Sequence, residues 1–490
     1  MGSINRLRLT PVLCAAAGAA AGYYALFYAP AAVIISVLTA AVTLLCFFRT
    51  LSSICVHSRK LQLTSVCAAA AAAGLSLGLC AADAGQNNVN FGIDEKNVTA
   101  IEGVLLEDPR IISGGSAMAS LSLQKCAGKG TSGNIHPDSS GVITVFFSQV
   151  NADKLKNFGR GTAVFAEGTL RSSSYGWSFS ARSLHVINPA SPLERMRTGI
   201  RLNLAARFEK ERWGGLALAL LLGIRDNLDS GFAERYRESG LSYILALSGM
   251  HLAILAAIIA FLLKRPLGLK VSAITGAILI ILYCFLVGPM PSLNRSALMY
   301  ILGVIALLGA LPKNSISILS LSFLIQIIAD PASGSTLSFA LSYAALLGII
   351  ITGQAFSFLL AGKIPDFILQ PLSLSAGAFL ATAGICSFTF GLIAPAGIIA
   401  GLLIVPLTTI FMVGSIIWLL LGIFSLSFLL NFPLTILYNL METISGAAGF
   451  IPGLTANPFF VLAFSLALSV LIVVFEYRRR KAMLTLRPFS

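Results

Sequence analysis

Runs of apolar residues long enough to cross a lipid bilayer occupy most of this chain. A transmembrane helix needs roughly 20 predominantly apolar residues, within a range of about 17–25. The sequence contains about twelve such runs, at 11–29, 31–48, 62–82, 243–263, 271–287, 292–311, 315–329, 336–359, 367–390, 396–423, 426–448 and 457–476. A chain that is 56% hydrophobic and 11% charged cannot bury this surface in a water-facing globule. The sequence therefore predicts a polytopic α-helical membrane protein and excludes a soluble enzyme, a disordered chain and a small disulfide scaffold.

The positions of lysine and arginine indicate how the chain is oriented. With the amino terminus in the cytoplasm, the connections predicted to be cytoplasmic are basic, whereas the short outer loops near Pro289, Asp330, Ala394 and Pro452 contain no Lys or Arg. This asymmetry follows the positive-inside rule. It predicts a multi-pass protein of the cytoplasmic (inner) membrane with both termini inside and a basic tail, 478–490, beside lipid headgroups. Much of the net charge of +14 therefore records orientation and is not evidence for a nucleic-acid partner.

The long polar insert between the third and fourth runs is predicted to face outward, and its first part, 83–190, has a β pattern. Its short alternating runs are separated by Gly, Ser, Asn and Asp clusters. They lie at 98–104, 119–123, 141–147, 163–168 and 176–181. Five strands with a long polar loop predict an extracytoplasmic OB-like β-barrel.

Such a barrel often binds single strands through aromatic faces and a basic groove. Aromatic residues at alternate strand positions are more often core residues, and acidic residues nearly cancel the basic ones across this domain. We retain Tyr175, Lys154 and Arg160 as candidate DNA contacts.

The second part of the insert, 191–240, has helical periodicity. Apolar residues recur at intervals of three and four from Leu193 to Phe208, with arginines between them. This pattern predicts an amphipathic helix on the membrane surface. Its basic face either anchors the helix to lipid or guides a polyanion, and the candidate guiding residues are Arg195, Arg197, Arg201 and Arg207.

A second apolar stretch, 216–222, is too short to span a bilayer. It ends at Gly223-Ile224-Arg225, which predicts a partly inserted segment or a pore entrance. Gly223 and Arg225 are therefore candidate entrance residues.

Ionisable residues inside apolar runs are costly and usually mark function. His251 is the only histidine in any run and follows Ser248 and Gly249. Arg295 lies early in the sixth run, where either snorkelling to the lipid surface or a basic pore lining explains it.

Enzymatic interpretations find little support in the sequence. Ser248 resembles a hydrolase nucleophile, but it needs a base that another element normally supplies, and a histidine three positions away is more often a helix-packing contact. The four histidines form no metal-ligand grouping, and there is no phosphate-binding GxxxxGK[ST] motif. The sequence thus predicts no catalytic residue, no metal and no cofactor.

The order of motifs resembles the ComEC competence family of DNA-uptake channels. The matching segments are ALLLGIR (219–225), GLSYILALSGMHL (240–252), PSLNRSA (291–297), Asp330-Pro331 with LSFALSY (337–343), and Pro395 leading to VPL (405–407). The resemblance covers nearly the whole chain and implies transport of single-stranded DNA across the cytoplasmic membrane during natural transformation. Carried onto this chain, the implied pore and entrance positions are Gly223, Arg225, Ser248, Gly249, His251, Ser292, Arg295, Phe339 and Ser342.

The resemblance also implies partners: a DNA receptor, an uptake helicase and a separate nuclease. Many family members continue into a metallo-β-lactamase-like domain, whereas this sequence stops soon after the basic run 478–481, so we expect a form without that domain. Tyr243 replaces a common histidine, and Gly401 lies about where an asparagine often precedes Pro406, so the resemblance assigns no polar role to those two positions.

The expected organisation is three amino-terminal helices, the OB-like domain, interfacial helices, a multispan channel domain and a tail. Their bounds are 1–82, 83–190, 191–240, 241–477 and 478–490. The alternative function is a related transporter or channel for another polyanion, and the sequence does not indicate an oligomeric state.

Overall fold

The computed structural model describes residues 11–28, 59–85, 89–112, 116–128, 139–148, 158–173, 176–245, 247–311, 314–391, 393–449 and 453–485. The chain divides into two compact units, which are described separately. The helical unit comprises Met1–Gly85, Asp229–Ile281 and Met290–Ser490. The barrel unit comprises Gln86–Leu228 and Leu282–Pro289.

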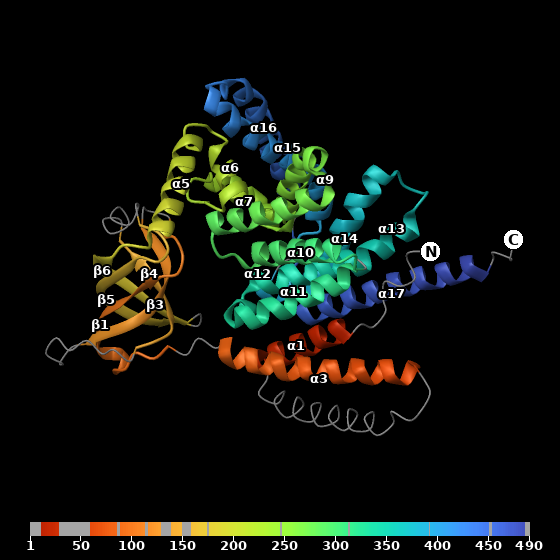
Figure 1. The fold of residues 1–490 in the computed structure, drawn as a ribbon, viewed down its shortest axis with the longest axis horizontal. Coiled ribbons are helices and arrows are strands. Elements are labelled where there is room, and N and C mark those ends of the chain that lie inside the picture. Colours follow the sequence, from red (N-terminus) through yellow and green to blue (C-terminus); the bar gives the residue numbers. More distant parts are fainter. Residues whose placement is uncertain are drawn as a thin grey trace. The chain divides into compact units, whose positions relative to one another are not determined.

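The barrel unit is built on a closed antiparallel and parallel sheet (Figure 1). Its strands are β1 (Val98–Leu105), β2 (Arg110–Ile111), β3 (Ala117–Gly128), β4 (Val142–Phe147), β5 (Ala163–Ser173) and β6 (Gly176–Asn188). The order is β1-β5-β6-β4-β3, and β1 also pairs with β3, which closes the ring; the two-residue β2 adds to the edge of β3. A five-stranded Greek-key barrel is the OB-type architecture. The predicted barrel insert is therefore confirmed.

Alternating side chains explain why these segments close on a core. Ile101, Leu121, Val145 and Phe179 point inward and are at most 1% exposed. Curvature comes from irregular registers at Glu102/Gly103 and Glu167/Gly168. A Cβ at Gly168 would lie 1.9 Å from the carbonyl oxygen of Ser180, so only glycine fits there.

Two helices complete the insert. α5 (Pro192–Phe208) begins after Ser191, whose hydroxyl accepts the Glu194 N–H as an N-cap, with proline in the first turn. α6 (Gly214–Leu222) is buried throughout and ends at Gly223, whose φ of 69° is the left-handed cap that favours glycine. A 3₁₀ turn, η1 (Glu95–Asn97), leads into β1.

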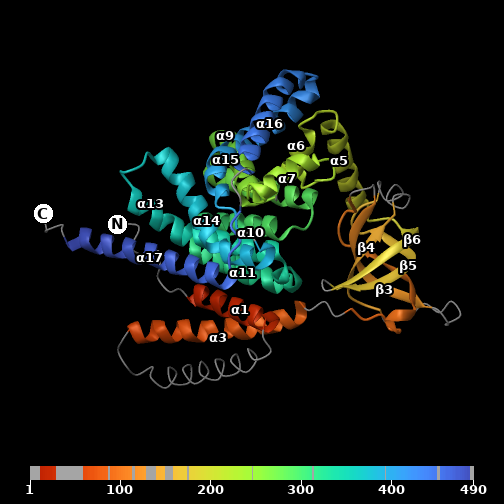
Figure 2. The ribbon, with the colours of Figure 1, turned by 180° about the vertical axis from the view of Figure 1, so that it is seen from behind.

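The helical unit contains the remaining elements, except that residues 282–287 at the end of the long helix 249–287 belong to the barrel unit (Figures 1 and 2). They are α1 (Pro11–Tyr28), α3 (Arg59–Gly85), α7 (Ser230–Glu238), α8 (Ser242–Leu245), α9 (Gly249–Val287), α10 (Pro291–Leu308), α11 (Ser315–Ala329), η3 (Pro331–Ser335), α12 (Leu337–Gly348), the π-helical η4 (Ile349–Gly353), α13 (Gln354–Leu360), α14 (Asp366–Phe390), α15 (Ala396–Leu421), η5 (Gly422–Phe424), α16 (Phe428–Gly449) and α17 (Pro458–Thr485). By length and composition, six helical stretches among the described residues could cross a membrane. Large apolar side chains such as Phe261 (80% exposed) and Phe367 (77% exposed) face outward, which suits lipid and not water. The protein is membrane-embedded.

The predicted apolar runs differ from the helices at two places. The run 243–263 was expected to be one helix, but α8 and α9 are separate and α9 begins only at Gly249. α9 then covers the fourth and fifth runs and is broken at Gly268 (φ 74°, ψ 170°), just after Pro266. The predicted run 31–48 lies outside the described residues.

Glycines bring α1 and α3 into backbone contact, and both views show the two helices side by side (Figures 1 and 2). A Cβ at Gly18 would lie 1.9 Å from the Ala71 carbonyl oxygen, and one at Gly74 would lie 1.9 Å from that of Ala15. This is the small-residue packing that lets membrane helices approach closely. The Tyr23 hydroxyl then donates to the Pro331 carbonyl (2.6 Å), which ties α1 to η3.

Candidate functional site

The sequence-predicted site residues fall into two groups. Arg160, Arg195, Arg197, Arg201, Arg207, Gly223 and Arg225 belong to the barrel unit, and Ser248, Gly249, His251, Ser292, Arg295, Phe339 and Ser342 belong to the helical unit. Lys154 and Tyr175 lie outside the described residues.

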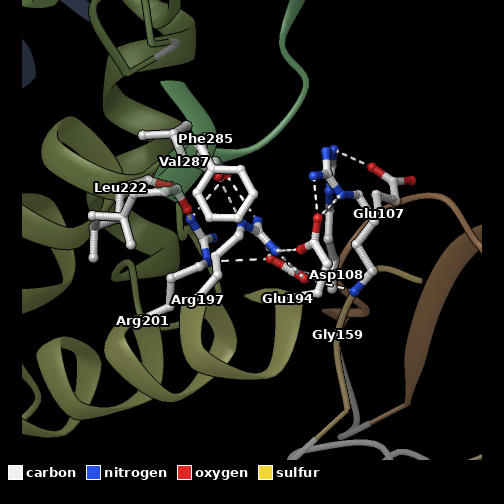
Figure 3. A network of polar contacts seen from close by, with 12 residues as sticks. Glu107, Asp108, Gly159, Glu194, Arg197, Arg201, Leu222, Phe285 and Val287 are labelled. Carbon is white, nitrogen blue, oxygen red and sulfur yellow. Dashed lines mark hydrogen bonds and ion pairs between the residues drawn. The ribbon is translucent and has the colours of Figure 1, made fainter. Parts of the chain in front are cut away.

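In the barrel unit, Asp108 gathers three arginines (Figure 3). Its carboxylate accepts two hydrogen bonds from Arg197, at 3.0 and 2.8 Å, and one from the backbone N–H of Arg160, at 3.0 Å. Arg201 Nε lies 3.1 Å from the same carboxylate. Glu194 pairs with both Arg160 and Arg197. These side chains join α5 to the loops of the barrel, and we refer to Asp108, Arg160, Glu194, Arg197 and Arg201 as the arginine clasp.

The same arginines also bind the carboxyl end of α9. Arg197 Nε donates to the Phe285 carbonyl (2.9 Å), and Arg201 donates to the carbonyls of Leu286 (3.0 Å) and Val287 (2.9 Å). The last carbonyls of a helix lack helical partners and carry its negative partial charge, so cations stabilise them. The clasp therefore fixes the end of α9 to the barrel.

Electrostatics within the clasp are mutually compensating. Burial alone would raise the pKa of Asp108, but the hydrogen bond from Arg197 and the positive charges of Arg201 and Arg197 hold that pKa below its ordinary value. Burial lowers the pKa of Arg201, against the opposing effect of Asp108.

The arginines of α5 differ in exposure because two of them are held in the clasp. Arg197 is only 1% exposed, whereas Arg195 and Arg207 are exposed. Two apolar residues, Leu193 (56%) and Met196 (57%), are also exposed. The predicted amphipathic helix is present, but Arg197 and Arg201 point into the protein, so they are occupied in holding it together.

The aromatic residues of the barrel are divided between its core and its surface. Phe179 is a core residue, and Trp177 packs edge-on against Phe91 at 5.3 Å between ring centroids. Phe146 is 39% exposed on β4. Its exposure agrees with strand alternation, because Phe147 occupies the inward position next to it.

The predicted entrance residues follow α6. Gly223 ends that helix, and burial with the nearby charge of Arg110 lowers the pKa of Arg225. Burial raises the pKa of the adjacent Asp226. This pair of charged residues thus lies in a partly desolvated turn.

In the helical unit, the candidates of three motifs converge at the start of α9. The Ser292 hydroxyl at the start of α10 donates to the Leu247 carbonyl at 2.6 Å. His251 is fully buried, and its Nδ1 accepts the backbone N–H of Ser248 at 3.1 Å, with the Ser248 hydroxyl also at 3.1 Å. A side chain in the first turn that accepts the N–H of the residue before the helix is a capping-box arrangement.

Arg295 lies at the centre of this cluster. It is 6% exposed, donates to the Ser342 carbonyl of α12, and its guanidinium carbon lies 5.6 Å from the centroid of the Tyr343 ring. A Cβ at Gly249 would lie 3.2 Å from its terminal nitrogen, so the glycine lets the backbone of α9 approach the guanidinium. The structure thereby brings together α9, α10 and α12.

Two residues that extend this cluster were missed by the sequence interpretation. The Tyr343 hydroxyl donates to the Gln326 amide oxygen at 3.0 Å, and the Gln326 amide nitrogen donates to the Pro291 carbonyl at 3.1 Å. Gln326 could have been found as a polar side chain inside an apolar run. Phe339, which was predicted, packs between Phe323 and Tyr343 at centroid distances of 5.5 and 4.7 Å and is 1% exposed.

The Ser248–His251 contact has only part of a hydrolase arrangement. A serine–histidine pair acts through a third group that orients the other ring nitrogen of the base. Among the residues that the structure describes, none accepts a hydrogen bond from His251 Nε2, and none form a cluster of three or more metal-binding side chains.

Known proteins match the region of the chain that contains this cluster. A family model described as Competence protein matches residues 220–479, which include every element of the cluster. ComE operon protein 3 of Bacillus subtilis (strain 168) is 31% identical over 149 residues, which are 29% of this chain. The matched region spans 19% of that protein's length. No solved structure matches the chain.

Proposed function

The chain belongs to the competence protein family, whose model covers residues 220–479 of 490, and from this membership we propose that it is a channel for single-stranded DNA. The channel carries the strand across the cytoplasmic membrane during natural transformation. It is passive: partners deliver the strand and draw it inward.

The observation that carries the proposal is the buried polar cluster of the helical unit. Three separate motifs bring Gly249, Arg295 and Ser342 together within an apolar set of helices. Polar and ionisable groups at such positions usually line a path for a substrate. A positive side chain suits a substrate that carries one negative charge per phosphate.

The barrel supplies the second part of the proposal. We place it on the outer side of the membrane, with both termini inside and about twelve spans, because of the distribution of basic residues. There it receives the strand by stacking on Phe146 and by attraction to exposed arginines such as Arg195 and Arg207. Arg197 and Arg201 hold the barrel to α5 and α9, and we assign them a structural role.

The proposal requires other proteins at each end of the path. A receptor presents DNA at the outer side, a nuclease removes one strand, and a helicase draws the other into the cytoplasm. This chain contributes binding and passage alone.

Deleting the gene in a competent cell tests the proposal. Uptake of labelled DNA into the cytoplasm should be lost while labelled DNA still accumulates at the cell surface, and restoring the gene should restore uptake. Unchanged uptake in the deletion strain would rule the channel out. If the deletion strain instead loses uptake of polyphosphate and takes up double-stranded and single-stranded DNA as before, the alternative function, transport of another polyanion, is favoured.

A further inference from the structure

Arg295 is a buried cation for which the described part of the chain supplies no balancing carboxylate. It is 6% exposed, and its protein contacts are neutral: the Ser342 carbonyl, the Ser296 hydroxyl at 3.4 Å and the Tyr343 ring. None of the ion pairs formed among the described residues includes Arg295. A buried charge is costly unless it is paired, so this position favours an anion.

The surrounding backbone adds to the positive potential. Arg295 lies in the first turns of α10, which begins at Pro291, and Gly249 at the start of α9 is close enough that a Cβ there would lie 3.2 Å from its guanidinium. The amino end of a helix carries a positive partial charge and free N–H groups. The guanidinium of Arg295 therefore lies against the amino end of α9.

His251 supplies a second unpaired donor at the same turn. Its Nδ1 accepts the Ser248 N–H, and a neutral imidazole that accepts at one nitrogen carries its proton on the other. The Nε2–H is therefore a donor, fully buried and without an acceptor among the described residues. Arg295 Nε is likewise buried without an acceptor in the part of the chain that the structure describes. Buried donors in proteins are normally paired.

We propose that Arg295, His251 and the first turn of α9 form a binding site for one phosphate oxyanion, and that its ligand is a phosphodiester of the transported strand. The site rests on the proposed function. In the structure, the Ser342 carbonyl accepts a hydrogen bond from the Arg295 guanidinium. A phosphate oxygen replaces this carbonyl as the acceptor when a strand separates α10 from α12. His251 acts as a neutral donor, so its role depends on an N–H and not on charge.

The site predicts different effects for different substitutions. Arg295→Gln removes a charge-assisted contact, and binding should weaken about 10- to 100-fold. The slope of log affinity against log salt should fall by about 0.7, the value for one phosphate contact on a single strand. His251→Leu should weaken binding about 2- to 10-fold. His251→Gln, which keeps a donor, should remain within about 2-fold of the parent protein. Arg237→Gln is the charge-matched control, because Arg237 is 74% exposed and pairs with Glu234.

The experiment uses the full chain purified in maltoside detergent, which contains no phosphate. Binding of a short oligothymidylate is measured against salt for each variant, and the parent protein is also tested with a strand whose phosphates are replaced by uncharged methylphosphonates. The site predicts weaker binding of the uncharged strand and a loss with Arg295→Gln beyond the Arg237→Gln control. The methylphosphonate comparison needs only the parent protein and tests whether binding depends on phosphate charge. His251→Leu, which changes no charge of the neutral imidazole, is the second variant that tests the site if Arg295→Gln does not fold.

Three outcomes separate the possible failures. If the parent protein binds the strand and Arg295→Gln and His251→Leu bind it equally well, the site is wrong and the channel stands. If the variants instead lose co-purified phosphatidylglycerol in native mass spectrometry while strand binding is unchanged, the ligand is a lipid headgroup and the assignment to DNA is overturned. If the parent protein binds no strand at all, the proposed function itself fails.

Discussion

Replacing Asp108 by asparagine should loosen the barrel from α5 and from the end of α9. The carboxylate balances Arg197, which is 1% exposed, and Arg201, whose side chain is 11% exposed. Removing one partner from a buried ion pair costs about 3–5 kcal/mol. Because Asp108 is 24% exposed and Glu194 still pairs with Arg197, we expect the lower end, about 3 kcal/mol. That value corresponds to a roughly 100-fold larger opening equilibrium constant.

Hydrogen exchange of the full chain in nanodiscs measures this opening directly. Local opening exposes backbone amides, so protection in α5 and at residues 282–289 should fall roughly 100-fold in Asp108→Asn. The matched control is Glu107→Gln at the preceding position, which loses an ion pair to Arg110, a side chain that is 56% exposed. The amide oxygen of the glutamine can still accept the hydrogen bonds that Glu107 accepts from Ser120. An exposed pair contributes about 0–1 kcal/mol, so the control should change protection by less than about 5-fold. Equal protection in the two variants would show that Asp108 does not hold the clasp.

Three further results follow from the structure. Since the folded-state pKa of Asp108 lies below its ordinary value, its stabilisation is complete above pH about 4 and declines below it, so exchange in α5 should rise only in that acidic window. Gly348→Ala should lower the melting temperature of the detergent-solubilised protein, because a Cβ there would lie 2.2 Å from the Gly377 carbonyl oxygen and overpacking costs about 1–3 kcal/mol. The control Gly303→Ala, which has open space around the new Cβ, should raise the melting temperature slightly. Phe146→Ala should weaken binding of single-stranded DNA about 10- to 100-fold in a fluorescence anisotropy titration, and unchanged affinity would remove β4 from the binding surface.

The overall architecture was predictable because two periodicities dominate this sequence. Long apolar runs indicate membrane helices, and alternating short runs such as 141–147 indicate barrel strands. Helix ends were less predictable. The residues from Tyr243 to Leu247 are as apolar as those of α9. However, α9 begins only at Gly249, because Ser248 and His251 cap its first turn.

The candidate site was predictable only in part, because local patterns do not record distant partners. The approach of Arg295 to Gly249 and Ser342 joins motifs that the sequence presents separately. The inward orientation of Arg197 depends on Asp108, which lies 89 positions earlier, so the helical pattern of α5 alone suggested a surface arginine.

Tyr243 and Gly401 show the same limit. The resemblance implies a departure from the family's pattern at both positions, and a Cβ at Gly401 would lie 2.6 Å from the Tyr243 hydroxyl. The glycine therefore leaves room for the tyrosine. Neither residue alone indicates that the two departures are complementary.

Transport into sealed vesicles tests the central claim most directly. The full chain is reconstituted into vesicles that enclose a single-strand-binding protein, which traps any strand that crosses, and external nuclease then removes the strand that remains outside. A passive channel predicts that labelled single-stranded DNA becomes nuclease-resistant over time, that duplex DNA does not, and that Arg295→Gln slows the process. Protected strand no greater than in protein-free vesicles would contradict the account.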